Sequence, residues 1–431
     1  MFTTLRNAWK ITELRKKILF TLLIIFIYRV CAVIPVPFVN MDGVIDMYKY
    51  ALNGTILDMF SVMAGNTQYA MANIMALGIQ PYINASIIVQ LLTIAIPALE
   101  RLSKEGGEEG KKTIEKITRY TTVGLGLLMG FAYYVMLKNY DKDYSLFIGA
   151  QKFITPAVII LSFAAGATLV MWLGEQITAH GIGNGISMIL FANILVRIPG
   201  TVISPIIGML WEEWYFSLLL VVATIAVIVF IVFVTQAERR IPVQYAKRTV
   251  GRKVYGGQSS HLPLKVNMSG VMPIIFAQSI ASLPATIAAF CRADQEGFWN
   301  KYVFSSTSAI YTVVYLILIV GFSYFYSTIQ YNPVEVANNL KKNGGFIPGF
   351  RPGRPTSDFI RKVIGKITLF GAIFLGIIAV LPVVLGAVLP ENGAAFSFGG
   401  TSVIIVVSVA LETVSAIEAQ MMMRNYSGFL D

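Results

Sequence analysis

The chain has 431 residues, of which 56% are hydrophobic and 13% charged, and its formal net charge is +11. A soluble domain carries about 25% charged residues, so this composition excludes an ordinary soluble protein. Apolar runs of roughly 20 residues recur from end to end and predict an all-α protein that crosses a membrane many times.

Ten such runs predict ten transmembrane helices, at residues 18–36, 70–98, 118–137, 153–173, 182–198, 215–235, 269–290, 306–328, 367–389 and 399–419. The second run is long and contains Pro81, which predicts a kink or tilt. Ten spans divide into two halves of five, residues 1–200 and 201–431. Because five is odd, the halves have opposite orientations, which permits an inverted pseudo-symmetry with a pathway between them.

The distribution of Lys and Arg predicts the orientation. The two termini, loop 99–119 and loops 236–267 and 328–367 carry 26 of these residues, and the opposite side carries 8. Because basic residues concentrate on the cytoplasmic side, we expect both termini in the cytoplasm.

The predicted exported loop 38–69 contains a short apolar stretch, TILDMFSVMAG at residues 55–65. It is far too short to cross a membrane. Two interpretations remain open at this point: a helix folded back into a protein-lined cavity, or a helix lying on the exported surface.

Two later segments place unusual residues within predicted spans. The second span contains three amides, Gln80, Asn84 and Gln90, which suit either helix–helix contacts or a face onto a polar pathway. The fifth begins with GIGNGIS at residues 181–187, where glycines favour close backbone packing. A nucleotide loop is disfavoured because no strand precedes it and no Lys follows.

No Asp, Glu, Lys or His lies at the middle of a predicted span, and the chain has only two histidines. Coupled carriers usually need ionisable midplane groups, and enzymes need a cluster of acid, base or nucleophile. We therefore expect no catalytic site, no metal and no cofactor. A secondary transporter of a small solute is the alternative function.

Loops 236–267 and 328–367 each hold seven Lys or Arg, against one and two acids respectively, and together account for the whole net charge. Their length exceeds what orientation alone requires. The second contains KKNGGFIPGFRPGRP, whose Gly and Pro residues suit a rigid hook presented to a partner. Loop 236–267 could bind RNA phosphates or an acidic protein groove.

Several long strings resemble the SecY family of protein-conducting channels: ALGIQPYINASIIVQLLT (76–93), WLGEQITAHGIGNGIS (172–187), AERRIPVQYAKR (237–248), SSHLPLKVNMSGVMP (259–273), NPVEVANNLKKNGGFIPGFRPG (332–353) and FGGTS (398–402). The resemblance covers essentially the whole chain. It implies a channel subunit of the bacterial cytoplasmic membrane that moves unfolded secretory polypeptides across and releases transmembrane segments sideways into lipid.

The resemblance also implies roles for individual residues. The channel waist would be a ring of aliphatic side chains, namely Ile79, Ile83, Ile186, Leu190, Ile275 and Ile405. A re-entrant plug would contain Ile56, Leu57, Met59, Phe60, Val62 and Met63. A lateral gate opened by signal sequences would contain Asn84, Gln90, Gln278 and Ser279.

The basic loops would then dock the motor ATPase SecA and the ribosome, including ribosomal RNA. The docking residues implied are Arg239, Arg240, Lys247, Arg248, Lys341, Lys342 and Arg351. SecE and SecG would complete the complex. Signal-bearing polypeptides and membrane lipid would be its other partners.

Overall fold

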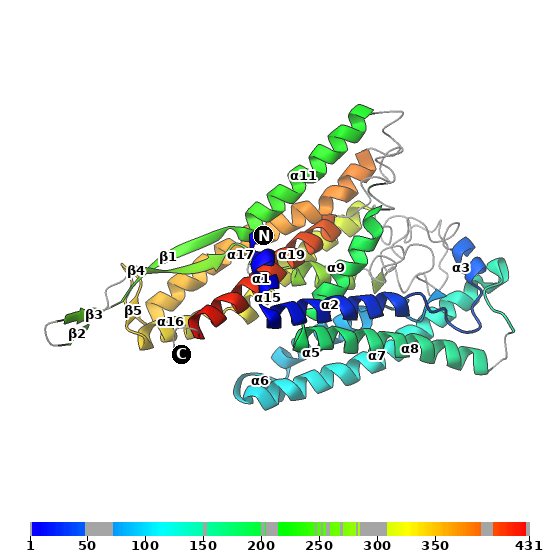
Figure 1. Cartoon of the computed structure of the whole chain (residues 1–431), viewed down its shortest axis with the longest axis horizontal. Helices are drawn as coiled ribbons and strands as arrows, with labels where there is room; N and C mark the ends of the chain where they lie inside the picture. Colours follow the sequence, from blue (N-terminus) through cyan, green and yellow to red (C-terminus); the bar gives the residue numbers. More distant parts are fainter. Residues whose placement is uncertain are drawn as a thin grey trace.

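The structure is a computed structural model that describes residues 2–47, 72–149, 153–199, 203, 214–245, 248–250, 253–255, 259–267, 270–281, 283–284, 308–388 and 400–427. It is mostly helical, with small sheets at one end (Figure 1). The helices are α1 (Phe2–Lys10), α2 (Thr12–Cys31), α3 (Met41–Met47), α5 (Gln80–Ala95), α6 (Pro97–Glu105), α7 (Gly107–Tyr144), α8 (Ile154–His180), α9 (Gly185–Ile198), α11 (Trp214–Gln236), α12 (Met272–Ala281), α15 (Ala309–Gln330), α16 (Pro333–Lys342), α17 (Arg354–Val388) and α19 (Gly400–Ser427). The strands are β1 (Glu238–Tyr245), β2 (Arg248–Val250), β3 (Lys253–Tyr255), β4 (Ser259–Lys265) and β5 (Gly345–Phe346).

Each of the ten predicted spans contains a helix, in the order α2, α5, α7, α8, α9, α11, α12, α15, α17 and α19. Within the described residues, five helices are long and apolar enough to cross a membrane, and the bent pair α5–α6 would make a sixth. The described apolar parts of α9, α11 and α12 are shorter, at 10–17 residues each. The coarser expectation of a helical protein with several membrane spans is therefore confirmed.

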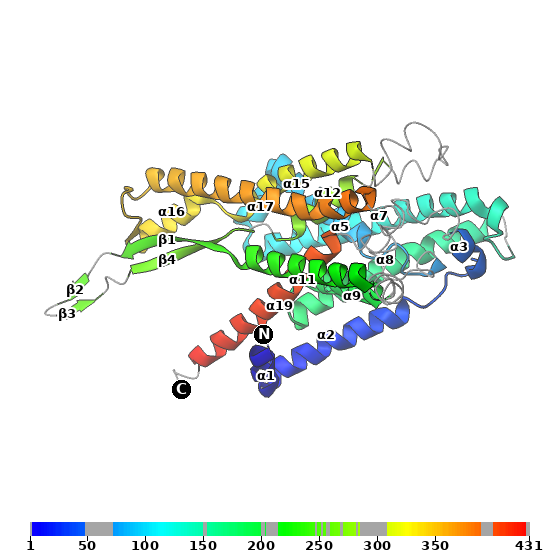
Figure 2. The ribbon, with the colours of Figure 1, turned by 90° about the horizontal axis from the view of Figure 1, so that it is seen from above.

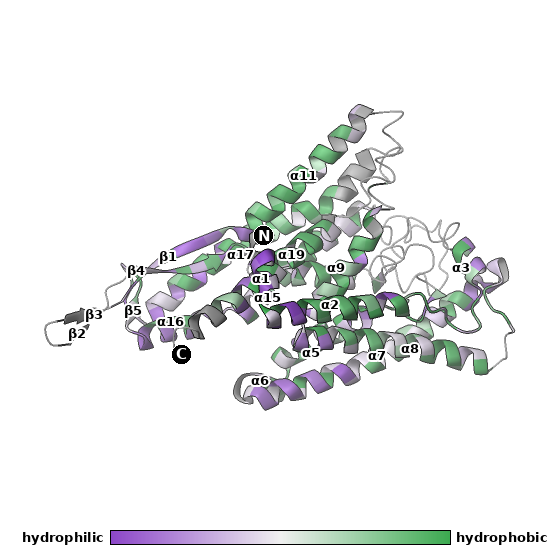
Figure 3. Ribbon diagram, viewed as in Figure 1, coloured by the Kyte–Doolittle hydropathy of each residue, from purple (hydrophilic) through white to green (hydrophobic). Residues whose placement is uncertain are grey.

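The outer face of α11 is typical of a helix in contact with lipid. Leu218, Val222, Ile225, Val229 and Phe233 recur every three or four residues, and each side chain is 56–73% exposed. Such a stripe would be an aggregation hazard in water but is favourable in hydrocarbon. Figure 3 shows this helix as largely hydrophobic, whereas hydrophilic residues gather on β1, α16 and α6.

Side-chain caps define where several helices begin. Asn184 accepts hydrogen bonds from the backbone N–H groups of Ile186 and Ser187, at 3.0 and 3.5 Å, before α9. Asn332 caps α16 in the same way through the N–H of Val334, at 3.1 Å. These contacts satisfy backbone donors that have no partner within the helix, and thereby fix where each helix starts.

The expected kink at Pro81 is wrong. Pro81 lies in the first turn of α5, where proline is tolerated because its missing N–H would have no helical partner. The chain bends instead by 105° at Ile96, between α5 and α6, and Pro97 starts the second helix. Residues before Gln80 form turns, so the helical part of the second run begins later than expected.

Close backbone packing at the GIGNGIS segment is confirmed. A Cβ atom added to Gly185 would lie 1.9 Å from the carbonyl oxygen of Gly174 in α8. The same constraint applies at Gly166 of α8, where a Cβ would lie 1.9 Å from the carbonyl oxygen of Ile74. These two glycines let the chain pass against α8 at distances that no other residue permits.

Three buried clusters organise the helices. One is formed by the loop around Val39 together with α3, α7 and α8, and a second by α11, α12, α15, α17 and α19. The third is central and draws on both groups, with residues from α2, α5, α8, α9, α12 and α19. Figure 2 shows α2 and α15 on opposite sides of the molecule, with α9 and α5 between them.

Loop 236–267 folds as a β-hairpin, which was not expected. β1 pairs antiparallel with β4, from Glu238 opposite Lys265 to Gln244 opposite Ser259. β5, from the second basic loop, adds to the other edge of β1 and gives the strand order β4-β1-β5. β2 and β3 form a separate two-stranded ribbon nearer the hairpin tip. The two basic loops therefore belong to one folded unit.

We predict that Gly166→Ala destabilises the protein. The added Cβ would collide with a backbone oxygen, and overpacking of this kind costs about 1–3 kcal/mol. The midpoint of thermal unfolding in detergent should fall. The matched control is Gly124→Ala in α7, where nothing lies within 4 Å of the added atom and stability should hold or rise. Equal midpoints for both variants would contradict the prediction.

Candidate functional site

Six aliphatic residues that are far apart in the sequence lie in one buried cluster at the centre of the molecule. They come from the start of α5 (Ile79, Ile83), from α9 (Ile186, Leu190), from α12 (Ile275) and from α19 (Ile405). Five are at most 5% exposed, and Ile186 is partly buried against the same cluster. Residues from four helices thus belong to one hydrophobic cluster, in which α5 contacts α12 and α9 contacts α19.

Two polar contacts from α2 flank the α9 residues of this cluster. The backbone N–H of Ile182 donates to Thr21 Oγ1 at 3.2 Å, just before α9 begins. Further along, Arg29 Nη2 donates to Asn193 Oδ1 at 2.8 Å, and Asn193 is fully buried. Sequence reasoning did not identify this pair, whose members are 164 residues apart.

The four predicted gate residues lie on two helices that contact each other, α5 and α12. Gln278 and Ser279 of α12 are buried, whereas Asn84 and Gln90 of α5 are partly exposed. Within the part of the chain that the structure describes, the buried side-chain oxygens of Gln90 and Gln278 accept no hydrogen bond. The structure therefore brings the two helices together without an amide–amide bond through these oxygens.

A cavity of about 990 Å³ opens beside Gln90, between α5, α6, α7 and α8 on one side and α15 and α16 on the other. Among the described residues, its lining combines hydroxyl and amide groups with four glutamates and includes no Lys or Arg; the glutamates are Glu100, Glu115, Glu175 and Glu335. This acidic lining contrasts with the net positive charge of the chain. Sequence reasoning missed it because its residues come from six helices.

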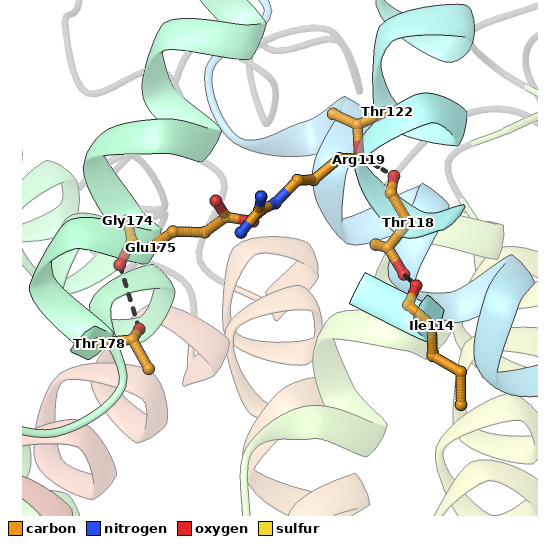
Figure 4. A network of polar contacts seen from close by, with 7 residues as sticks. All are labelled: Ile114, Thr118, Arg119, Thr122, Gly174, Glu175 and Thr178. Carbon is orange, nitrogen blue, oxygen red and sulfur yellow. Dashed lines mark hydrogen bonds and ion pairs between the residues drawn. The ribbon is translucent and has the colours of Figure 1, made fainter. Parts of the chain in front are cut away.

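A polar network ties α7 to α8 at the edge of this cavity (Figure 4). Arg119 Nε donates to Glu175 Oε1 at 2.8 Å, with both side chains partly exposed. The Thr118 and Thr122 hydroxyls donate to backbone carbonyls one turn earlier in α7, which satisfies them inside an apolar helix. The ion pair holds the glutamate against α7 while the cavity remains open beside it.

The predicted plug residues, Ile56, Leu57, Met59, Phe60, Val62 and Met63, lie outside the described residues. Lys247 also lies outside them. These assignments stay predictions.

The remaining docking residues lie on the unit formed by the two basic loops, which we name the platform: β1, β4, β5, the segment 347–353, α16 and the first turns of α17. Its core contains Ile241, Val243, Leu264, Ile347 and Ile360. Each of these side chains is at most 4% exposed. The platform thus has a hydrophobic core of its own, built from both loops.

Five predicted docking residues are exposed on the platform: Arg239, Arg240, Lys341, Lys342 and Arg351. Arg240 pairs with Glu238 at 2.7 Å, but its side chain remains 69% exposed. Arg248 begins the short strand β2. Both views draw the platform and the C-terminal end of α19 toward the same end of the long axis (Figures 1 and 2).

The segment around Arg351 is held in one shape by local contacts. The Thr356 hydroxyl donates to the Arg351 carbonyl oxygen at 2.8 Å, and the rings of Phe350 and Phe359 stack at 4.2 Å. Gly349 and Gly353 have φ values of +87° and +108°, which only glycine adopts without strain. An exposed guanidinium on a fixed backbone is a suitable contact for an acidic or phosphate-bearing surface.

Comparison with known proteins identifies relatives along the full length. A sequence model of the SecY family matches residues 73–414. The chain is 42% identical to protein translocase subunit SecY of Streptomyces griseus and 40% identical to that of Bacillus subtilis, with 100% of each chain covered. A solved structure of a protein-conducting channel aligns with a TM-score of 0.66 at 17% identity, covering 94% of this chain and 92% of the other. Sec61 in a canine ribosome–channel complex aligns with a TM-score of 0.61 at 16% identity, with the same coverage.

We predict that Gly345→Val loosens the platform. A Cβ at Gly345 would lie 2.9 Å from the Tyr245 ring and 3.3 Å from a methyl group of Val243, so β5 must move away from β1. A local loss of about 1–2 kcal/mol corresponds to roughly 5–30-fold more frequent opening. Limited proteolysis within residues 236–267 should accelerate accordingly. Gly365→Ala in α17, with nothing within 4 Å of the added atom, serves as control. Unchanged cleavage of the valine variant would contradict the prediction.

Proposed function

Because this chain belongs to the SecY family of protein translocase subunits, we propose that its aliphatic centre is the constriction of a channel for unfolded polypeptides. One observation carries the proposal: six aliphatic side chains from α5, α9, α12 and α19 meet in a single cluster. The first two helices precede residue 200 and the last two follow it, which supports a constriction at the junction of the two proposed halves.

The chemistry of the constriction suits a substrate of any sequence. Branched aliphatic groups expel water from a narrow passage, and a dewetted passage blocks ions. They form no hydrogen bonds, so a passing chain meets no site at which it would be retained. The side chains come from four separate helices, so small helix displacements widen the passage.

In the proposed arrangement ten helices cross the bacterial cytoplasmic membrane, as two inverted halves with both termini in the cytoplasm. The clusters support the halves, because one contains only residues before 200 and another only residues after it. The 26 to 8 imbalance of Lys and Arg supports the orientation. Residues 55–65 would close the exported side as a plug.

The lateral gate would lie between α5, which carries Asn84 and Gln90, and α12, which carries Gln278 and Ser279. A buried amide oxygen without a partner costs about 1–3 kcal/mol, so this interface is weaker than an aliphatic one. An apolar signal helix that separates α5 from α12 would expose these amides to water or to its own backbone. It would then have a direct route into lipid.

The platform would dock SecA or the ribosome, because a channel subunit needs a partner that supplies the energy for transport. Its exposed basic residues and the fixed Arg351 segment suit phosphate or carboxylate groups. The matched Sec61 structure is that of a ribosome–channel complex, which is consistent with such a partner. SecE and SecG would be the other subunits of the membrane complex.

A secondary transporter for a small solute is not favoured. Such carriers place ionisable groups at the midplane. The six proposed constriction residues are aliphatic, and the glutamates line a cavity outside this cluster.

The deciding experiment reconstitutes the chain with SecE, SecG and SecA in vesicles and adds ATP and a secretory precursor. Accumulation of a protease-protected precursor supports the channel; its absence, with uptake of a small solute, refutes it.

We predict that replacing Ile79, Ile83 and Ile275 with Ser makes the resting channel leak. Hydroxyls let water into the constriction, and ions follow the water. The conductance of reconstituted planar bilayers should rise at least several-fold. Ile159→Ser removes an equally buried aliphatic group from the cluster of α3, α7 and α8, and should add no conductance. An unchanged resting conductance of the triple variant would count against the constriction.

We also predict that Arg351→Glu abolishes SecA-dependent transport while the complex stays assembled. The side chain is exposed, so reversing its charge disturbs a docking contact and not the fold. The readout is ATP-dependent precursor protection, with assembly followed by co-purification of the subunits. Lys138→Glu, an exposed charge reversal in α7 outside the platform, is the control and should retain most transport. Normal transport by the Arg351 variant would refute its role.

A further inference from the structure

We propose that α2 holds α9 in position through one contact on each side of the constriction residues Ile186 and Leu190. Arg29, which contacts Asn193, is the positioning residue on the C-terminal side of Leu190. The inference deepens the proposed function and rests on it. It concerns how the closed constriction is held, and it assigns a role to a charged residue inside the predicted first span.

The geometry of α9 places an amide on the same face as the constriction. Ile186, Leu190 and Asn193 are separated by four and three residues, and such residues lie one above the other on a helix. Asn193 therefore continues the face of the two aliphatic residues by about one turn. A buried amide at this point must find hydrogen-bond partners, or it destabilises the packing.

Those partners come from α2. Arg29 Nη2 donates to Asn193 Oδ1 at 2.8 Å, and the Tyr28 hydroxyl also hydrogen-bonds to the Asn193 side chain. The guanidinium carbon lies 5.3 Å from the centroid of the Tyr28 ring, within range of a cation–π interaction. Tyr28 is fully buried in the same cluster as the constriction residues.

The other end of the α9 segment is fixed to the same helix. Thr21 Oγ1 accepts the N–H of Ile182, and a Cβ at Gly181 would lie 2.5 Å from that oxygen. Thr21 and Arg29 are eight residues apart on α2, close to two helical turns. Their contacts at Ile182 and Asn193 bracket Ile186 and Leu190. α9 is thus tied to α2 on both sides of its constriction residues.

A brace of this kind matters because aliphatic contacts have no preferred direction. Hydrophobic packing alone lets α9 rotate or slide with little change in buried area. Directional hydrogen bonds to α2 select one rotation, the one that points Ile186 and Leu190 into the cluster. Loss of the Arg29–Asn193 contact should therefore loosen the closed constriction before it affects assembly.

The test measures resting ion conductance and precursor transport for Arg29→Met, Asn193→Leu and the double variant, all reconstituted with the accessory subunits. An interhelical hydrogen bond in a membrane is expected to shift the closed–open balance by about 3- to 10-fold. Each single variant should raise the resting conductance by that factor while precursor transport persists. The double variant should leak no more than either single one, because both remove the same contact.

Two comparisons separate positioning from general stability. Ser327→Ala removes the buried 2.9 Å bond between Ser327 and Thr368, which joins α15 to α17 away from the constriction, and should not leak. Asn193→Asp keeps the shape and strengthens the pairing with Arg29, so its conductance should stay at or below the unaltered level. A leak in either variant, or none in the Arg29 and Asn193 variants, overturns the proposal.

The Ile79, Ile83 and Ile275 triple variant is measured in the same bilayers. If it leaks and the Arg29 variants do not, the brace fails and the constriction stands. If the triple variant does not leak either, the proposed constriction itself fails. If the Met and Leu variants do not assemble, Asn193→Asp still decides, because any increase in its conductance contradicts a brace.

Discussion

The centre of this protein depends on close packing between helices that are distant in the sequence, around a shared aliphatic cluster. In a membrane, apolar packing is no more favourable against protein than against lipid, so helix association depends on shape, on small residues and on a few hydrogen bonds. The glycines of α8 and of the segment before α9 supply the close approach. The hydrogen bonds of Thr21 and Arg29 select one rotation of α9 relative to α2. The aliphatic cluster is the part of the molecule that these features position.

Polar groups are placed around that cluster rather than within it. The amides of α5 and α12 lie at the helix–helix contact, and the glutamates line a cavity next to it. The cost of burying polar atoms is lowest where water can reach them, as at the glutamates of the cavity, whereas Gln278 and Ser279 are buried. The aliphatic cluster and the cavity with its polar lining therefore lie within the same set of helices. The ion pair of Arg119 and Glu175 lies at the edge of this cavity, where its exposure keeps the cost of both charges small.

The sequence was sufficient for the parts of the fold that depend on hydrophobic length. All ten apolar runs contain helices. The six aliphatic positions, which occupy one cluster, were implied by the family resemblance and not by hydrophobic length. Sequence reasoning failed where one residue type is compatible with two local structures. Pro81 could kink a helix or start one, and only the turn before Gln80 decides between them. The basic composition of loop 236–267 did not predict a hairpin. The signal for a strand is the alternation of buried and exposed residues in β1, where exposed Pro242 separates buried Ile241 and Val243. The Arg29–Asn193 pair could not be predicted, since 164 residues separate its members.

The sheet that joins the two basic loops has a mechanical consequence. β1 follows α11 after a single residue, β4 leads toward α12, and the segment after β5 leads into α17. A pull applied anywhere on the platform is transmitted through strand pairing to all three helices at once, and none of these connections reaches a helix before residue 200. A partner that binds the platform and moves would therefore displace the helices after residue 200 relative to those before it. That displacement would act mainly on the central aliphatic cluster, which contains residues from both groups of helices.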